Sequence, residues 1–158
     1  SNGEPITKYL PNATSPKKAM FASAAFSAPS KRQLGAYQQV HVTTGVDGAS
    51  PHRLVQMLFE GLLDSFAQAR GAMRQGNIEA KGEAIGRAVR IIDEGLKAGL
   101  NLDEGGRLAE DLRDLYAYVT VRLIYANRHN DEAAIGECTR LIEPLSKAWA
   151  EMGQKAAA

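Results

Sequence analysis

The sequence of 158 residues contains a single cysteine and lacks any apolar run of the length that a bilayer requires. One thiol, that of Cys138, excludes an intramolecular disulfide and is typical of a protein in a reducing compartment. A transmembrane helix needs about 20 consecutive apolar residues, and no stretch of this chain approaches that number. We therefore expect a cytoplasmic protein that does not insert into a membrane.

Residues with the spacing of a catalytic or metal site are also lacking. The three histidines, His41, His52 and His129, are scattered, and no Glu is followed by His three positions later, as di-iron bundles require. No glycine-rich loop joins a strand to a helix, so phosphate binding is not supported. Because 19 Lys and Arg nearly balance 18 Asp and Glu, the charge does not indicate nucleic-acid binding. We expect no enzymatic activity, no metal and no cofactor.

The first 32 residues differ from the rest in composition and charge. Four prolines fall in this stretch, which carries a net charge of +4 against −3 for the remainder. No helical or strand period persists, so we expect a flexible tail over residues 1–32, either wholly native or in part a tag or fused segment. In residues 33–49, Leu34, Tyr37 and Val40 form a short apolar face, which predicts an extended or partly helical cap segment.

From Ser50 onward, apolar residues recur every three or four positions, which is the period of an amphipathic helix. Ser50 and Pro51 form a typical helix start, as N-cap and first helical residue. Four such stretches follow one another, and each has one core stripe. The stripes are Leu54, Leu58, Leu62, Phe66, Ala69 and Met73; Ile78, Ile85, Val89, Ile92 and Leu96; Leu108, Leu112, Leu115, Val119, Leu123 and Ala126; and Ile135, Cys138, Leu141, Ile142, Leu145, Trp149 and Met152.

Short links between four amphipathic helices imply antiparallel neighbours. The sequence therefore predicts an all-α protein, an antiparallel up-down four-helix bundle over residues 50–153 with a tail at 154–158. Gly99 is expected to end the second helix, and Asp103 and Asp131 to cap the third and fourth. Pro144 removes one backbone hydrogen bond inside the fourth helix and clashes with the preceding turn, so this helix should be kinked or split near Pro144.

The third helix carries a second apolar face in addition to its core stripe. At about 100° per residue, Tyr118, Val121 and Tyr125 cluster roughly opposite Leu112 and Val119. Either another part of this chain covers the face, or a partner binds there. Both hold if the N-terminal segment leaves when a partner arrives.

The second helix bears mostly small residues opposite its stripe, namely Ala80, Ala84, Ala88, Ile91 and Ala98. Small side chains let another helix approach closely, but alanine is also the best helix former and needs no partner to explain it. Together with the tyrosine face of the third helix, this second surface favours recognition of a partner helix in a groove.

Eight short pieces of the chain form a distinctive ordered set. They are Ala36–Val40, Ser50–Leu54, Met57–Gly61, Gly76–Ile78, Gly105–Gly106, Leu115–Tyr118, Arg122–Asn127 and Leu145–Trp149. In this order they resemble the flagellin export chaperones of the FliS family. Each piece is weak evidence by itself, whereas the ordered set is specific. The resemblance covers about residues 33–152 and leaves residues 1–32 outside it.

The resemblance implies a helical bundle that binds the unstructured C-terminal segment of newly made flagellin and prevents its premature polymerisation. It also implies delivery to the export gate, the membrane protein FlhA. The tyrosine motif of the family maps to Tyr37, and its LY-x-Y motif maps to Leu115, Tyr116 and Tyr118. Members of this family can cover part of the binding surface with their N-terminal segment, which fits Tyr37 and Val40.

We therefore expect a monomer or weak homodimer whose flagellin groove, or the cap of that groove, is formed by eight residues. These are Tyr37, Val40, Ala80, Ala84, Ile91, Tyr118, Val121 and Tyr125. Two other interpretations stay open: a structural or signalling bundle that self-associates through the same faces, and, ranked far below, a bundle enzyme or metal carrier.

Overall fold

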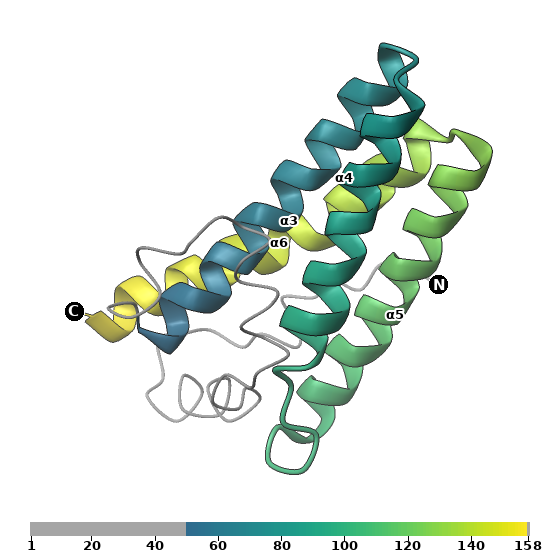
Figure 1. The fold of residues 1–158 in the computed structure, drawn as a ribbon. Helices are drawn as coiled ribbons and strands as arrows, with labels where there is room; N and C mark the ends of the chain where they lie inside the picture. The colour runs from purple at the N-terminus through teal and green to yellow at the C-terminus, as the bar shows by residue number, and fades with distance from the viewer. Residues whose placement is uncertain (1–49, 158) are drawn as a thin grey trace.

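The computed structural model describes residues 50–157, and this part of the chain is built from helices joined by short links (Figure 1). The elements are α3 (Pro51–Arg74), α4 (Ile78–Arg90), the π-helix η3 (Ile91–Lys97), α5 (Gly106–His129) and α6 (Glu132–Ala157). The predicted all-α class is confirmed. The tail at 1–32 and the cap segment at 33–49 lie outside the described residues.

The helices follow one another in alternating directions, which confirms the up-down bundle (Figure 1). α3 packs against α4 and α6, and α5 packs against α6, α4 and η3, so α3 and α5 occupy opposite corners. In Figure 1, α6 runs obliquely from the end of α5 back to the beginning of α3. Consequently α6 meets α5 through its first half, at Glu137 and Cys138, whereas its contacts with α3 continue to Trp149.

Apolar side chains from every helix fill one core, and their removal from water is the main source of stability. The largest fully buried ones are Tyr116, Phe66, Leu58, Leu62, Ile91, Ile92, Leu96, Leu123, Ile135, Ile142, Leu145 and Val119. The predicted core stripes are confirmed with one exception. Ile78 is 77% exposed, because it is the first residue of α4 and lies at the end of the bundle.

The start of α3 and the turn between α3 and α4 have the capping residues that the sequence indicates. Ser50 accepts a hydrogen bond of 3.1 Å from the backbone N–H of Arg53 at the start of α3. The left-handed conformation of Gly76, with φ of 69°, reverses the chain after α3. The side chain of Asn77 then accepts a hydrogen bond of 3.0 Å from the N–H of Ala80 and so caps α4.

The second helix does not continue as an α-helix to residue 98. It changes at Ile91 into the π-helix η3, in which hydrogen bonds reach one residue further along the chain. The wider turn rotates the side chains to new positions, and the adjacent Ile91 and Ile92 are both completely buried. The predicted outer face of small residues is wrong for Ile91, Ala84 and Ala88, which are 0%, 3% and 0% exposed. α4 packs against both α3 and α5, so it buries a wider arc than one stripe.

Two predicted caps are wrong and one is confirmed. α5 begins at Gly106 after Gly105 and not at a cap by Asp103. Gly99 does not adopt the left-handed conformation of a helix-ending glycine, since Gly76 and Gly106 are the glycines with positive φ among the described residues. Asp131 does cap α6, because its side chain accepts a hydrogen bond of 3.2 Å from the N–H of Ala134.

α6 passes Pro144 without a break, so the predicted split is absent. Pro144 and Arg140 are both exposed, and the Arg140 carbonyl that loses its helical partner can therefore bind water. The helix also continues to Ala157, four residues beyond the predicted end of the bundle. Among residues 50–157, none of the helices combines the length and the apolar character needed to cross a bilayer.

Candidate functional site

One face of α5 exposes four large apolar side chains, which we call the α5 outer face. Tyr118 is 46% exposed, Val121 63%, Ile124 55% and Tyr125 40%. Contiguous apolar side chains on a surface mark a site of interaction more often than isolated ones do. Tyr118, Val121 and Tyr125 share one face, as their spacing predicts, and the described helices leave that face exposed. The sequence argument missed Ile124, which lies about 60° around the helix from Val121 and so at the edge of the predicted cluster.

The carboxylate of Glu137 on α6 holds two side chains of α5 at the edge of this face that lies next to α6. The Oε1 atom of Glu137 accepts a hydrogen bond of 2.9 Å from the hydroxyl of Tyr118 and one of 2.8 Å from Nε of Arg122. The hydrogen bond to Glu137 is the main cause that raises the pKa of Tyr118, and the same partner raises the pKa of Arg122. Tyr118 and Arg122 are thus held together against α6.

The second tyrosine of the face, Tyr125, contacts the guanidinium group of Arg122 and the ring of His129. The guanidinium carbon of Arg122 lies 4.7 Å from the ring centre of Tyr125, which is cation–π geometry. The Tyr125 ring also lies 4.2 Å from the ring of His129 with a tilt of 32°. A continuous chain of contacts therefore links Glu137 to His129 through Arg122 and Tyr125.

This network determines what the face can do. Side chains that neighbouring groups already hold lose little rotational freedom when a partner arrives, so less binding free energy is spent on ordering them. The face presents apolar surface with an ion pair beside it and no nucleophile or paired acid and base. It is suited to an amphipathic helix that places its own apolar stripe on α5.

The three residues of the predicted LY-x-Y motif have different environments. Tyr116 is completely buried, and its hydroxyl has no hydrogen-bond partner among the described residues. Burial raises the pKa of Tyr116 far above its usual range, so its hydroxyl stays protonated. Leu115 packs partly buried against the core, and only Tyr118 reaches the surface. Tyr116 and Leu115 therefore contribute packing to the site rather than contact surface.

The remaining predicted site residues are not gathered at the α5 outer face. Ala84 and Ile91 lie in the core, and Ala80 is half-buried near the beginning of α4. Tyr37 and Val40 lie outside the described residues. The structure thus brings together Tyr118, Val121 and Tyr125, and it adds Ile124, Arg122, Glu137 and His129 to them.

Cys138, the lone cysteine, is confirmed as a core residue. Its side chain is completely buried, and its thiol lies 3.8 Å from the carbonyl oxygen of Val119. Burial raises the pKa of Cys138 to about 12, which keeps the thiol protonated. In the part of the chain that the structure describes, no three His, Cys, Asp or Glu side chains are grouped closely enough to hold a metal ion.

A second feature lies at the turn between α3 and α4. An open pocket of about 290 Å³ is lined by Ala72, Met73, Gly76, Asn77, Ile78, Lys81 and Asn130. The ammonium group of the buried Lys81 donates hydrogen bonds of 3.0 Å to the carbonyl of Asn127 and 3.2 Å to the side chain of Asn130. Because these acceptors end α5, the lysine serves as a cap for that helix and is not available to a ligand.

Comparison with known proteins yields one consistent set of relatives. The family model described as flagellar protein FliS matches residues 33–156. The flagellar secretion chaperone FliS of Salmonella typhimurium is 45% identical over 123 residues, which cover 78% of this chain and 91% of that protein. FliSB of Pseudomonas aeruginosa is 43% identical over 72% of this chain and 89% of its own length. FliS of Bacillus subtilis is 31% identical over 72% and 80%.

Proposed function

Since this chain belongs to the FliS family of flagellar secretion chaperones, we propose that it binds the C-terminal segment of flagellin in the bacterial cytoplasm. Binding keeps that segment from polymerising before export and holds it ready for the export gate protein FlhA. The protein performs no chemistry in this role. It acts by covering apolar surface of its client.

The α5 outer face is the observation that carries this proposal. The terminal segment of a filament protein is amphipathic and needs its apolar stripe covered until assembly. Tyr118, Val121 and Tyr125 recur at three and four residues along α5, which is the spacing that contacts one stripe of a partner helix. Tyrosine is also enriched among the residues that dominate binding energy, because it combines a large apolar ring with a polar tip.

The energetics are those of a client that folds as it binds. Burial contributes about 25 cal/mol per Å² of apolar surface. Ordering a disordered segment consumes roughly 2–5 kcal/mol of that gain or more. A large contact area with moderate affinity follows, and the client can be released at the gate without chemical energy from the chaperone.

A titration of the flagellin C-terminal peptide into the protein tests this function by calorimetry. Truncation of two tyrosines, Tyr118→Ala with Tyr125→Ala, should leave the fold intact and weaken binding about tenfold or more. Leu102→Ala is the matched control, since Leu102 is 43% exposed and lies in the link before α5, which runs more than three helical turns before it reaches Tyr118. Unchanged affinity in the double variant would refute the α5 outer face as the client site.

The N-terminal cap belongs to the same proposal. We expect residues 33–49, with Tyr37 and Val40, to cover part of the binding surface until the client replaces them. Deletion of residues 1–40 should leave a cooperative melting transition and strengthen binding of the flagellin peptide. A deletion product without cooperative melting would show instead that this segment is part of the core structure.

Delivery to the export gate is tested separately. The complex of this protein with flagellin should be retained by the immobilised cytoplasmic part of FlhA more strongly than either component alone. Equal retention with and without flagellin would argue against delivery of a loaded chaperone.

Self-association through the α5 outer face is the second candidate function, because an exposed apolar face fits a copy of the same chain equally well. Light scattering of the protein with and without flagellin distinguishes the two. A chaperone gives a one-to-one complex, whereas a self-associating bundle forms oligomers of the same size in both samples.

A further inference from the structure

The turn between α3 and α4 extends beyond the turn between α5 and α6 (Figure 1), and the described helices leave part of it uncovered. Ile78 shows the consequence. Its position places it in the core stripe of α4, yet 77% of its side chain is exposed. Ile78 lines the open pocket of about 290 Å³ at this turn together with Met73 from the end of α3. This end of the bundle therefore carries an unfilled apolar recess.

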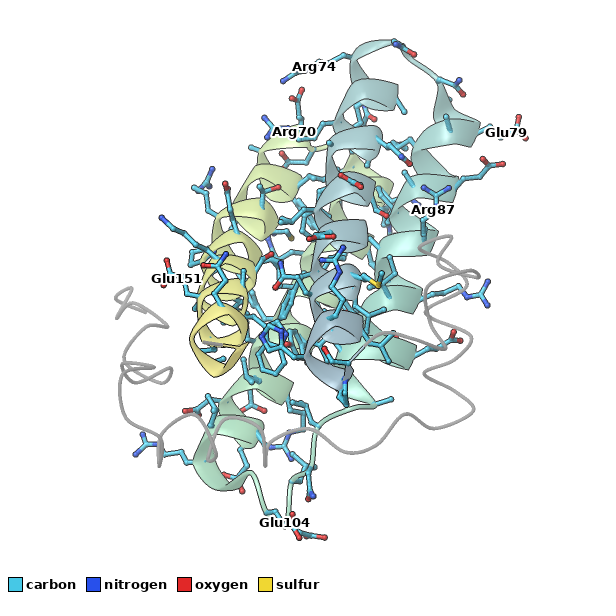
Figure 2. All side chains as sticks on the ribbon, turned by 90° about the vertical axis from the view of Figure 1, so that its left-hand side faces the viewer. Arg70, Arg74, Glu79, Arg87, Glu104 and Glu151 are labelled. Atoms are coloured by element: carbon cyan, nitrogen blue, oxygen red, sulfur yellow. The ribbon has the colours of Figure 1, made fainter. Side chains whose placement is uncertain are left out.

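The pocket is suited to an apolar group because its polar side chains already have partners. Asn77 accepts a hydrogen bond of 3.0 Å from a backbone N–H in the first turn of α4, and Lys81 donates one of 3.2 Å to Asn130. Figure 2 shows Arg74 and Glu79 leaving the turn in opposite directions, and neither lines the pocket. The volume lies just below the roughly 300–1,000 Å³ of small-molecule sites, so the pocket fits a single large side chain better than a cofactor.

The end of α5 joins this pocket to the α5 outer face. Ile124 is 55% exposed at the edge of that face, and Asn127 follows it by one helical turn, about 60° further around α5. The carbonyl oxygen of Asn127 accepts a hydrogen bond of 3.0 Å from Nζ of Lys81, which lines the pocket. A polypeptide that leaves the α5 outer face past Ile124 therefore arrives at the pocket.

We propose that this pocket binds one large apolar side chain of the client, at the point where the client segment passes the end of α5. This inference rests on the proposed function, because the client is the segment that contacts the α5 outer face. Ile78 and Met73 form the apolar walls of this second contact. A leucine, isoleucine, methionine or phenylalanine side chain of the client fills the space between them.

The size of the recess favours the client over a second copy of this chain. Stable complexes between two proteins bury about 1,200–2,000 Å² in total, which a recess for one side chain cannot supply. A second copy would have to be held by the recess alone. A client that already lies on the α5 outer face reaches the pocket in an intramolecular step at high effective concentration, so a small additional contact is enough.

The geometry sets the distance between the two contacts along the client. Asn130 lines the pocket and follows Tyr118 by about 12 residues on α5, which corresponds to about 18 Å along the helix axis. A helical client covers this distance with about 12 residues, and an extended one with about five. The client should therefore carry a large apolar residue about 5–12 positions from the one that contacts Tyr118.

Calorimetry with the flagellin C-terminal peptide as the probe tests the pocket. Ile78→Ser should weaken binding about five- to tenfold, because the peptide then no longer removes an exposed isoleucine from water. Leu102→Ser is the matched control, since Leu102 is also exposed, at 43%, and its link, where Figure 2 labels Glu104, lies at the opposite end of the bundle. This control should change binding less than twofold.

A substitution that fills the pocket separates binding from stability. Ala72 lines the pocket and is 6% exposed. Ala72→Leu should occupy part of the empty space, so that the melting temperature stays equal or rises while binding of the peptide weakens about threefold or more. Ala67→Leu is the matched control, because Ala67 is an exposed residue of the same helix outside the pocket lining. It should leave binding unchanged.

The peptide identifies the same contact from its own side. Replacing its pocket residue by alanine should weaken binding to the natural protein about five- to tenfold. The same replacement should have little added effect on Ile78→Ser, because both changes remove one contact. Full additivity of the two changes at every apolar position of the peptide would overturn the pocket as a client contact.

The outcomes separate this inference from the function on which it rests. A peptide that does not bind the natural protein would overturn both. Natural affinity in Ile78→Ser and in Ala72→Leu would overturn the pocket alone. Without peptide, a smaller particle size of Ile78→Ser in light scattering would also overturn it, because a second copy would then occupy the pocket. Faster proteolysis of residues 1–49 in Ile78→Ser would do the same, because the chain's own N-terminal segment would then fill the space.

Discussion

His52 and Trp149 hold each other by hydrogen bonds that run from the side chain of each residue to the backbone of the other. The ring atom Nε2 of His52 lies 2.6 Å from the Trp149 carbonyl oxygen, and Nε1 of Trp149 donates to the His52 carbonyl at 2.9 Å. The two rings also stack, with centres 4.7 Å apart and planes 3° from parallel. Because the residues are 97 positions apart, this contact joins the beginning of α3 to the end of α6.

The close approach of His52 to α6 depends on Gly153, and Gly153→Ala should therefore destabilise the fold. A Cβ on Gly153 would lie 2.0 Å from a carbon atom of the His52 ring, so the ring must move and the stack must break. We expect a loss of about 1–3 kcal/mol in the free energy of unfolding by urea, as for other overpacked sites. Gly86→Ala has open space around its Cβ and should be neutral or stabilising. Equal stability of both variants would show that His52 does not depend on Gly153.

Lys81 links α4 to the end of α5, and its loss should loosen that end. The side chain is 7% exposed and bonds the Asn127 carbonyl and the side chain of the left-handed Asn130. Lys81→Met keeps the length but leaves these acceptors without their donor, at about 1–3 kcal/mol of unfolding free energy. Lys147→Met, on the exposed side of α6, should stay within about 0.5 kcal/mol of the natural protein. A Lys81→Met variant as stable as the natural protein would mean that desolvation of the ammonium cancels its hydrogen bonds.

Much of the fold could be predicted from the sequence because periodicity reports burial directly. Ser50 and Pro51 mark the start of α3, Asp131 marks the start of α6, and the stripes contain 19 of the 27 core residues, though not Phe59 or Tyr116. The exceptions are places where tertiary contacts override local preference. α4 packs against both α3 and α5 and so buries a wider arc than one stripe, and Ala84, Ala88 and Ile91, which the sequence assigned to an outer face, lie in the core.

The candidate site was predictable only in part. The spacing of Tyr118, Val121 and Tyr125 places them on one face of α5 opposite its core stripe, and the folded bundle leaves that face exposed. Glu137 carries no such sign in the sequence. Its role depends on how α6 lies against α5, because its contacts with Tyr118 and Arg122 exist only in the folded bundle.

Cys138 should resist thiol reagents in the folded protein. With a pKa of about 12, its thiolate fraction at pH 8 is on the order of one in ten thousand, and the side chain is also completely buried. A disulfide reagent should therefore label no thiol under native conditions and one thiol per chain in guanidinium. Ala133→Cys, which places a second thiol on the exposed side of α6, should label at once without denaturant. Rapid labelling of Cys138 in the native protein would show that the α5–α6 contact opens.

Glu137→Gln should change both the ionisation of Tyr118 and the binding of the client. The hydrogen bond to the Glu137 carboxylate raises the pKa of Tyr118, so this bond stabilises the fold fully below the ordinary tyrosine pKa of about 10. That contribution is lost as the pH rises through the higher pKa of the folded protein. With glutamine at position 137, the pKa of Tyr118 should fall towards its usual value. The difference in phenolate absorbance between each protein and its Tyr118→Phe counterpart measures this pKa.

The same substitution also frees Tyr118 and Arg122 from their shared acceptor, and binding of the flagellin peptide should weaken about two- to fivefold through lost preorganisation. Glu143→Gln is the matched control, because Glu143 is an exposed acid on the same helix and has no hydrogen bond within the described residues. It should leave both the Tyr118 titration and the affinity unchanged. If Glu137→Gln shifts the titration of Tyr118 but leaves the affinity equal to that of Glu143→Gln, the order of the α5 outer face does not contribute to client binding.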